Sequence, residues 1–443
     1  MNNIEIKTPC GNIKGIDNND YVEFRGIKYA NADRWEYPTQ ITSWDGTYDA
    51  TEFGECSYQR RGFEDDATCN AFYHKEFRKG MTFEYSEDCQ FLNIYAPKNA
   101  KDCPVLIYIH GGSFTGGSSN EGHINGTKYA KNGVVCVTIN YRLNAFGFVA
   151  HPDLKDENGI KANFGLYDQL TAIKWVKDNI ESFGGKANNI VLMGQSAGAM
   201  SIDILISSPL CKGWFKGAIM MSGAGLMRTI SKPLTPKKIT RLWNLAIKNA
   251  GKTNINELKD IDKRDLFYAW SDACEQDKLS IIDTLPVIDG KMITSDSMRM
   301  DNIPDIPIII GVTCTDMIPI VMEAITKSYV KRITKYNKCY VYNFNRNLPG
   351  DNSGAWHSCD ILYAFKTLGI NWRPFEEIDY RISHEMFSAF SSFAKTGDPN
   401  CVEIPHWSSD GKTPMRFCEN TASMPWDTKL LFKNTFSNNG AEF

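Results

Sequence analysis

Residues 193–201, MGQSAGAMS, join an apolar stretch of strand length to an apolar, proline-free stretch of helix length. Gly194, Ser196 and Gly198 fit the pattern G-x-S-x-G. A serine at such a junction must occupy a very tight turn, because side chains at the two glycine positions would collide with the adjoining strand and helix. The turn lifts the serine hydroxyl above the sheet, within reach of a base. The segment therefore predicts that Ser196 is a nucleophile.

Strand-like and helical stretches alternate along the chain. The predicted strands are residues 104–109, 133–140, 189–194, 216–222, 306–311 and 338–344. Several are continuous apolar runs, as expected of strands that helices cover on both faces. Residues 163–183 are predicted to form a helix that ends at Gly184-Gly185, because apolar residues recur in it every three or four positions: Leu166, Leu170, Ile173, Val176 and Ile180. Strand, helix and strand in this order predict a right-handed crossover and a parallel sheet.

Two other regions complete the expected architecture. Residues 4–16 and 21–30 alternate in polarity and are joined by polar turn residues, which predicts an N-terminal antiparallel hairpin. Residues 231–299 are more charged and lack strong strand signals. We interpret about 226–300 as a helical insertion over the carboxyl edge of the sheet. The chain is thus expected to form one α/β domain, residues 1–443, with a central, mostly parallel sheet flanked by helices.

Composition excludes several classes of partner. The net charge of −3 and the isoelectric point near 6.2 give no indication of nucleic acid or an anionic membrane surface. The first twenty residues contain no apolar core of signal-peptide length, and no stretch approaches the roughly 18 apolar residues of a membrane helix. The thirteen cysteines are scattered without a CxxC pair. We therefore expect reduced thiols and a cytoplasmic protein, a monomer or small homo-oligomer.

A serine nucleophile needs a neighbouring base and an acid that orients the base. In this kind of fold the chain order is nucleophile, acid, base, which leaves three candidate histidines: His357, His384 and His406. His384 lies in a helical pattern, which indicates a helix surface, and His406 lies beside a turn and a tryptophan, which indicates packing. His357 lies in a glycine-flanked loop before an apolar segment, GAWHSCDILYAF, where a side chain can project over a sheet edge.

The acid should follow a strand between the serine and the base. Asp316 comes shortly after the apolar run that ends at Gly311, although a turn-forming aspartate is the competing interpretation. Asp301 and Asp305 precede that strand and so lie at its wrong end. Position alone does not decide whether Asp316 is the acid or a turn-forming residue.

A glycine-rich loop follows the first central strand. Residues 106–119, LIYIHGGSFTGGSS, contain glycines that let backbone N–H groups turn toward a reacting carbonyl. The competing interpretation is a phosphate-binding loop. That loop would end in Gly-Lys-Ser/Thr, whereas no lysine follows here until Lys128. The segment therefore favours an oxyanion hole.

These segments, together with others in the same order, support a family resemblance. They are SEDCQFLNIYAP (86–97), IHGGSF (109–114), NYRLNAFGF (140–148), NFGLYDQ and NIESFGG of the long helix, GQSAGA (194–199), GVTCTD (311–316), GAWHSCDILYAF (354–365) and FAKTGDPN (393–400). Nearly end to end, the chain resembles the type-B carboxylesterase and cholinesterase-like family of the α/β-hydrolase superfamily, in particular its bacterial para-nitrobenzyl-esterase-like members.

The resemblance implies roles for individual residues. Ser196 is the nucleophile, His357 the general base, and Asp316 the acid at a position where the family usually has glutamate. The implied oxyanion donors are the backbone N–H groups of Gly112, Ser113 and Ala197. No metal or cofactor is implied. The implied scaffold ion pairs are Arg34 with Glu87 and Arg142 with Asp168.

The chain departs from the family in two respects. Secreted members often form a disulfide that here would join Cys89 to Cys56 or Cys69, whereas a cytoplasmic chain would leave these thiols reduced. Asp316 and His357 are only 41 positions apart, a shorter interval than is usual. Because the absent segment normally adds helices around the active-site gorge, we expect a shallower and more open site.

The expected function is a serine carboxylic-ester hydrolase that acts on a small-molecule ester through an acyl-enzyme. Two alternatives remain: the same triad acting on amides, carbamates or thioesters, and a non-catalytic cholinesterase-like binding protein. Sequence does not decide among the leaving groups, because pocket shape selects them. Four residues beside the motifs are candidates for an apolar substrate pocket, with core packing as the competing interpretation: Phe114, Met221, Met317 and Trp356.

Overall fold

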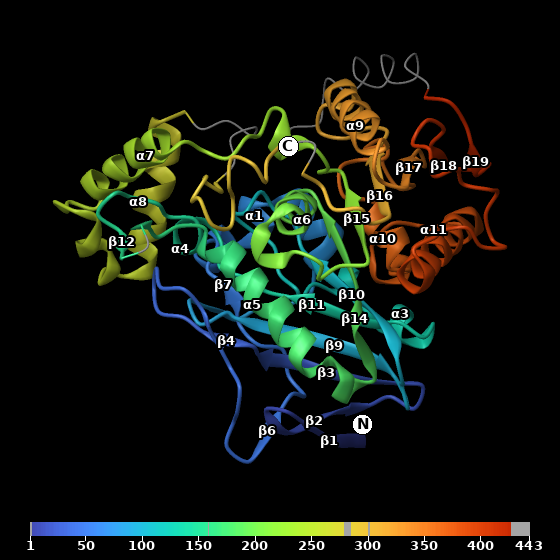
Figure 1. The fold of residues 1–443 in the computed structure, drawn as a ribbon, viewed down its shortest axis with the longest axis horizontal. Helices are drawn as coiled ribbons and strands as arrows, with labels where there is room; N and C mark the ends of the chain where they lie inside the picture. The colour runs from blue at the N-terminus through green and yellow to red at the C-terminus, as the bar shows by residue number, and fades with distance from the viewer. Residues whose placement is uncertain (1, 158, 279–284, 300–301, 427–443) are drawn as a thin grey trace.

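The computed structural model describes residues 2–157, 159–278, 285–299 and 302–426, and a 13-stranded sheet runs through this part of the chain (Figure 1). The strand order across the sheet is β1 (Asn2–Thr8), β2 (Gly11–Asp17), β3 (Tyr21–Lys28), β9 (Phe91–Pro97), β11 (Val135–Ile139), β10 (Cys103–Ile109), β14 (Gly185–Gln195), β15 (Gly217–Met221), β16 (Ile308–Thr313), β17 (Cys339–Phe344), β18 (Met415–Phe417) and β19 (Ala422–Ser423), and β6 (Thr47–Asp49) pairs with β2. The strands from β11 to β18 are parallel. All six predicted strands are confirmed, and together they form most of this parallel part.

The N-terminal region has one strand more than the predicted hairpin. Residues 4–16 do not form a single strand, because the chain reverses after Thr8 and the two halves pair as β1 and β2. Gly11 has φ 130°, and the Thr8 hydroxyl closes the turn by accepting from the Cys10 N–H and donating to the Gly11 carbonyl. Strand β9 was also not predicted; it lies antiparallel between β3 and β11.

Helices cover both faces of the parallel strands, which explains their continuous apolar runs. Val105, Ile107 and Ile109 of β10 belong to one buried cluster, whereas Leu106 and Tyr108 belong to a second cluster on the opposite face. The first cluster includes side chains of α5 (Phe164–Asn179) and α6 (Ala197–Ser207), which lie in front of the central strands in Figure 1. The second includes side chains of α3 (Thr127–Lys131), α10 (Asp360–Ala364) and α11 (Glu377–Thr396).

The predicted crossover helix is confirmed as α5 followed by a 3₁₀ turn, Ile180–Phe183, and Gly184 ends it in the left-handed conformation at φ 78°. Within the stretch 226–300, α7 (Pro236–Asn249) and α8 (Lys263–Gln276) pack against each other, at the upper left of Figure 1 near α4 (Asn144–Gly147). None of the helices in the described ranges is long and apolar enough to cross a bilayer.

Both implied scaffold ion pairs are present. Arg142 donates two hydrogen bonds to Asp168, at 2.8 and 2.7 Å, and both side chains are buried. Arg34 pairs with Glu87, and its guanidinium also donates to two backbone carbonyls of the segment before α8. All thirteen cysteines are free thiols, so Cys89 forms no disulfide.

Candidate active site

Ser196 lies between β14 and α6 with φ 54° and ψ −123°, a strained conformation for a residue with a side chain. Its N–H donates to the Met221 carbonyl of the neighbouring strand at 2.8 Å. A Cβ at Gly198 would lie 2.0 Å from the Ile109 carbonyl oxygen, and one at Gly194 would lie 2.7 Å from the Gly198 carbonyl carbon. Both positions therefore require glycine, because backbone atoms cannot move aside as a flexible side chain can. The predicted tight turn is present.

His357 and Asp316 come together from loops at the carboxyl ends of adjacent strands. Asp316 follows β16 and His357 follows β17, and a β-bridge between Thr315 and Trp356 joins the two loops. His357 Nδ1 lies 2.5 Å from Asp316 Oδ1, and both side chains are buried. Among the three candidate histidines, the structure thus places His357 beside the predicted acid, whereas His384 and His406 are exposed elsewhere.

Four donors surround the Asp316 carboxylate. Oδ2 accepts from the Ser222 hydroxyl at 2.7 Å and from the Thr313 N–H at 3.3 Å. Oδ1 accepts from the Met317 N–H at 2.9 Å and faces His357 Nδ1. Burial raises the pKa of Asp316, but the His357 charge and these hydrogen bonds outweigh burial and hold the pKa below its usual range. The acid therefore stays ionised at neutral pH.

The same pair sets the pKa of His357. Burial lowers it, whereas the charge and hydrogen bond of Asp316 raise it, and the net result is a pKa above 6.5. With its Nδ1 proton directed at Asp316, neutral His357 presents an unprotonated Nε2. This is the nitrogen that a general base needs.

Gln195 occupies the other side of this imidazole. Its side-chain nitrogen lies 3.0 Å from His357 Nε2, so that the amide donates to the base. No hydrogen bond joins Ser196 to His357 among the described residues, although both line the same cavity. Contacts of this kind are often loose without substrate. Gln195 was not predicted, because the second position of G-x-S-x-G carries no required residue type.

The glycine-rich loop after β10 presents backbone donors beside Ser196. Gly112, Ser113 and Phe114 have successive positive φ angles of 112°, 54° and 60°. Within the described ranges, the N–H groups of Gly112, Ser113 and Ala197 donate to no other residue. Ala197 begins α6, where the first N–H groups have no partner inside the helix. Three unpaired donors at a strained serine fit an oxyanion.

Two cavities meet at Ser196. The larger, of about 400 Å³, also contains Gln195 and His357. Its wall includes these aromatic and charged residues: Tyr73, Phe77, Tyr108, His110, His123, Arg60, Arg61, Arg78 and Glu121. The smaller, of about 70 Å³, is mostly apolar and includes Phe114, Met200, Leu226, Ile230, Val321 and Met322. Ser113, Ser196 and Met317 line both.

Two of the four predicted pocket residues line these cavities and two do not. Phe114 lines the smaller cavity and Met317 lines both. Met221 and Trp356 are buried in the core, because Met221 ends β15 inside a helix-covered layer and Trp356 packs against an aromatic cluster behind the site that includes Phe72. The charged wall of the larger cavity was not predicted, since its members come from segments that show no common motif.

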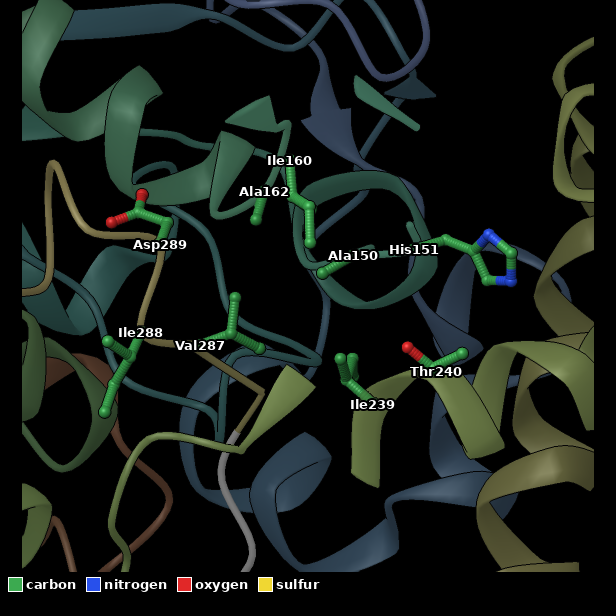
Figure 2. A pocket seen from close by; sticks show the side chains of 9 residues that line it. All are labelled: Ala150, His151, Ile160, Ala162, Ile239, Thr240, Val287, Ile288 and Asp289. Carbon is green, nitrogen blue, oxygen red and sulfur yellow. The ribbon is translucent and has the colours of Figure 1, made fainter. Parts of the chain in front are cut away.

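Another cavity, of about 150 Å³, lies apart from Ser196 and shares no lining residue with these two (Figure 2). Aliphatic side chains such as Ile160, Ile239 and Val287 dominate it. Figure 2 shows the His151 imidazole directed away from them, and Asp289 accepts hydrogen bonds from two nearby backbone N–H groups. The His151 imidazole and the Asp289 carboxylate are thus both held by neighbouring residues.

Comparisons with known proteins show the family to which the chain belongs. Residues 2–332 and 319–434 match the model of the carboxylesterase family. The chain is 28% identical to fumonisin B1 esterase of Sphingopyxis macrogoltabida, over 90% of this chain and 83% of that protein, and 28% identical to para-nitrobenzyl esterase of Bacillus subtilis, over 91% of each. A solved para-nitrobenzyl esterase superposes with a TM-score of 0.84 at 23% identity, covering 98% of this chain and 99% of that one. A Geobacillus stearothermophilus carboxylesterase superposes with a TM-score of 0.78 at 26% identity, covering 97% and 99%. The chain belongs to the carboxylesterase family and is a serine hydrolase with the α/β-hydrolase fold.

Proposed function

We propose that the protein hydrolyses small-molecule carboxylic esters through an acyl-enzyme on Ser196. The observation that carries the proposal is the buried Asp316–His357 pair, whose imidazole lines the same cavity as a strained serine. The unpaired N–H groups at Gly112, Ser113 and Ala197 support it, because they provide donors for the developing oxyanion.

In the first half-reaction, His357 Nε2 takes the Ser196 proton while the hydroxyl oxygen attacks the ester carbonyl carbon. The backbone donors stabilise the tetrahedral oxyanion, and Asp316 stabilises the imidazolium. The carbon–oxygen bond to the alcohol then breaks, and His357 gives its proton to the departing alcohol. The Gln195 amide must leave Nε2 before the base can accept a proton there.

In the second half-reaction, His357 takes a proton from water, and the oxygen of that water attacks the acyl-enzyme carbonyl. Collapse of the second tetrahedral intermediate returns the proton to Ser196 and releases the carboxylic acid. General-base action contributes about 10²–10⁴-fold and one oxyanion donor about 10²–10³-fold. The proposed residues thus account for a large share of the acceleration.

We also propose a cytoplasmic protein of one domain, residues 1–443, with an open active site. The thirteen free cysteines support a reducing compartment. The exposure of Gly112 and Ser113, next to a partly exposed Ser196, supports an open rim.

Replacement of the nucleophile tests the function. Ser196→Ala should lower kcat/KM for p-nitrophenyl butyrate by about 10⁴-fold or more and abolish labelling by a fluorophosphonate, with the melting temperature preserved. The control is Ser43→Ala, at an exposed loop serine. Matched amide, carbamate and thioester substrates measured beside the ester decide the leaving group. Turnover that survives Ser196→Ala would contradict the proposal.

A further inference from the structure

The wall of the larger cavity carries more positive than negative charge. Arg60, Arg61 and Arg78 line it, whereas Glu121 is the one carboxylate among its described lining residues. Arg60 pairs with Glu64, and Arg78 donates two hydrogen bonds to a carboxylate; neither of these acids lines the cavity. Acids outside the cavity thus neutralise Arg60 and Arg78, which leaves Arg61 and Glu121 as the charged pair within its wall.

Arg61 is the buried member of this wall with unused donors. Its side chain is 4% exposed, and its Nη2 lies 2.8 Å from Glu121 Oε1. Among the residues that the structure describes, no guanidinium nitrogen of Arg61 makes a hydrogen bond of good geometry, and Glu121 Oε1 also lacks one. Leaving buried donors of a charged group without hydrogen bonds is unfavourable, and a ligand at this wall would satisfy them. A guanidinium with several free N–H groups matches a carboxylate in geometry and charge.

The position of the base tells which part of an ester enters this cavity. His357 must protonate the departing alcohol, so the alcohol lies on the side of the imidazole. His357 lines the larger cavity and not the smaller one. The acyl chain then enters the smaller, apolar cavity beside Phe114 and Met200.

We propose that the larger cavity binds the alcohol part of an ester that carries a carboxylate, with Arg61 as its principal ligand. This inference rests on the proposed function, and it names the substrate class as aryl or alkyl esters of hydroxycarboxylic acids with a short, apolar acyl group. Phe77 stacks on His123 at 3.8 Å and provides an aromatic wall for the ring of such an alcohol.

Among the other titratable groups of this wall, the two histidines are uncharged and Glu121 is an anion that Arg61 compensates. Burial lowers the pKa of His110 and of His123 to about 4, so both imidazoles are neutral hydrogen-bonding groups. Burial raises the pKa of Glu121, but the Arg61 charge outweighs burial and keeps that acid ionised. Among the described residues, Arg61 Nε and Nη1 make no hydrogen bond, so these donors remain for the ligand.

The test compares two acetate esters of the same shape. The carboxylate of 4-acetoxybenzoate is replaced by an uncharged amide in 4-acetoxybenzamide. The unmodified protein should hydrolyse 4-acetoxybenzoate with a kcat/KM about tenfold higher or more, as one charge-assisted hydrogen bond provides. Equal values would overturn the carboxylate site while leaving the esterase intact. If the protein hydrolyses neither of these two esters nor p-nitrophenyl acetate, the proposed function itself is overturned.

A variant assigns the preference to Arg61. Arg61→Gln combined with Glu121→Gln removes both charges without leaving one buried and unpaired. The kcat/KM ratio of the two esters should fall to about one, whereas Arg381→Gln, at an exposed arginine of α11, should keep the wild-type ratio. A preference that persists in the double variant would contradict the assignment. If that variant does not fold, competitive inhibition of the unmodified protein decides: benzoate should bind about tenfold more tightly than benzamide, and equal inhibition would refute the site.

Discussion

Replacing Asp316 with asparagine tests its proposed role as the acid of the triad. The carboxylate receives Ser222 and Thr313 on one oxygen and Met317 and His357 on the other. An amide has a single oxygen, so it cannot accept from both sets. With its nitrogen toward His357 it forces the proton onto Nε2, and with its oxygen there it keeps the tautomer but loses the charge. Either orientation removes the anion that stabilises the imidazolium.

The magnitude follows from the burial of this pair. His357 and Asp316 are 5% and 2% exposed, and removing one partner of a buried charged pair costs about 3–5 kcal/mol. The imidazolium forms only in the transition state, so this cost appears in the barrier. At about 1.4 kcal/mol per factor of ten, kcat should fall by about 10²–10⁴-fold. KM should change little, because neither group binds the ground state through this contact.

The assay is the pH dependence of kcat/KM for p-nitrophenyl butyrate. In the unmodified protein, activity should fall with decreasing pH through a midpoint above 6.5, because protonation of His357 removes the base and Asp316 raises its pKa. In Asp316→Asn, burial acts without the opposing charge, so the midpoint should move to lower pH. A variant with more than a third of the wild-type kcat and an unmoved midpoint would refute the assignment. Ser222→Ala, which removes one donor and keeps the charge, should cost less than tenfold.

Two other substitutions test the local geometry. Gln195→Glu places a second carboxylate at His357 Nε2, which stabilises the imidazolium. The acid-side midpoint of the pH profile of kcat/KM should therefore move to higher pH. An unchanged midpoint would show that this side chain does not contact the base in solution. Gly198→Ala should lower the free energy of unfolding by about 3 kcal/mol or more, because the new methyl group would meet a backbone carbonyl at 2.0 Å. Gly369→Ala, where a Cβ meets no atom within 4 Å, is its control in denaturant melts, and equal stability of the two variants would refute the steric argument.

The sequence by itself determined the features that depend on neighbours along the chain. The central strands were predictable because helices on both faces require continuous apolar runs, and Ser196 because its turn requires two nearby glycines. His357 stood out by its loop, but Asp316 emerged only with the family resemblance, since many carboxylates follow strands. The N-terminal hairpin was predicted with one strand too few. The alternation of polar and apolar residues continues unchanged through the sharp turn around Gly11, so the pattern does not reveal the turn.

Only the tertiary structure decided what surrounds the reacting atoms. Gln195 reaches His357 across 162 positions, and Arg61 reaches Glu121 from the 3₁₀ turn Arg60–Gly62. Met221 adjoins the site in sequence yet packs in the core, because side chains alternate between the two faces of a strand. Cavity walls are assembled from loops that meet only when the sheet is formed, so no local pattern encodes them. The motif around Ser196 identifies the reaction, and packing selects the ester.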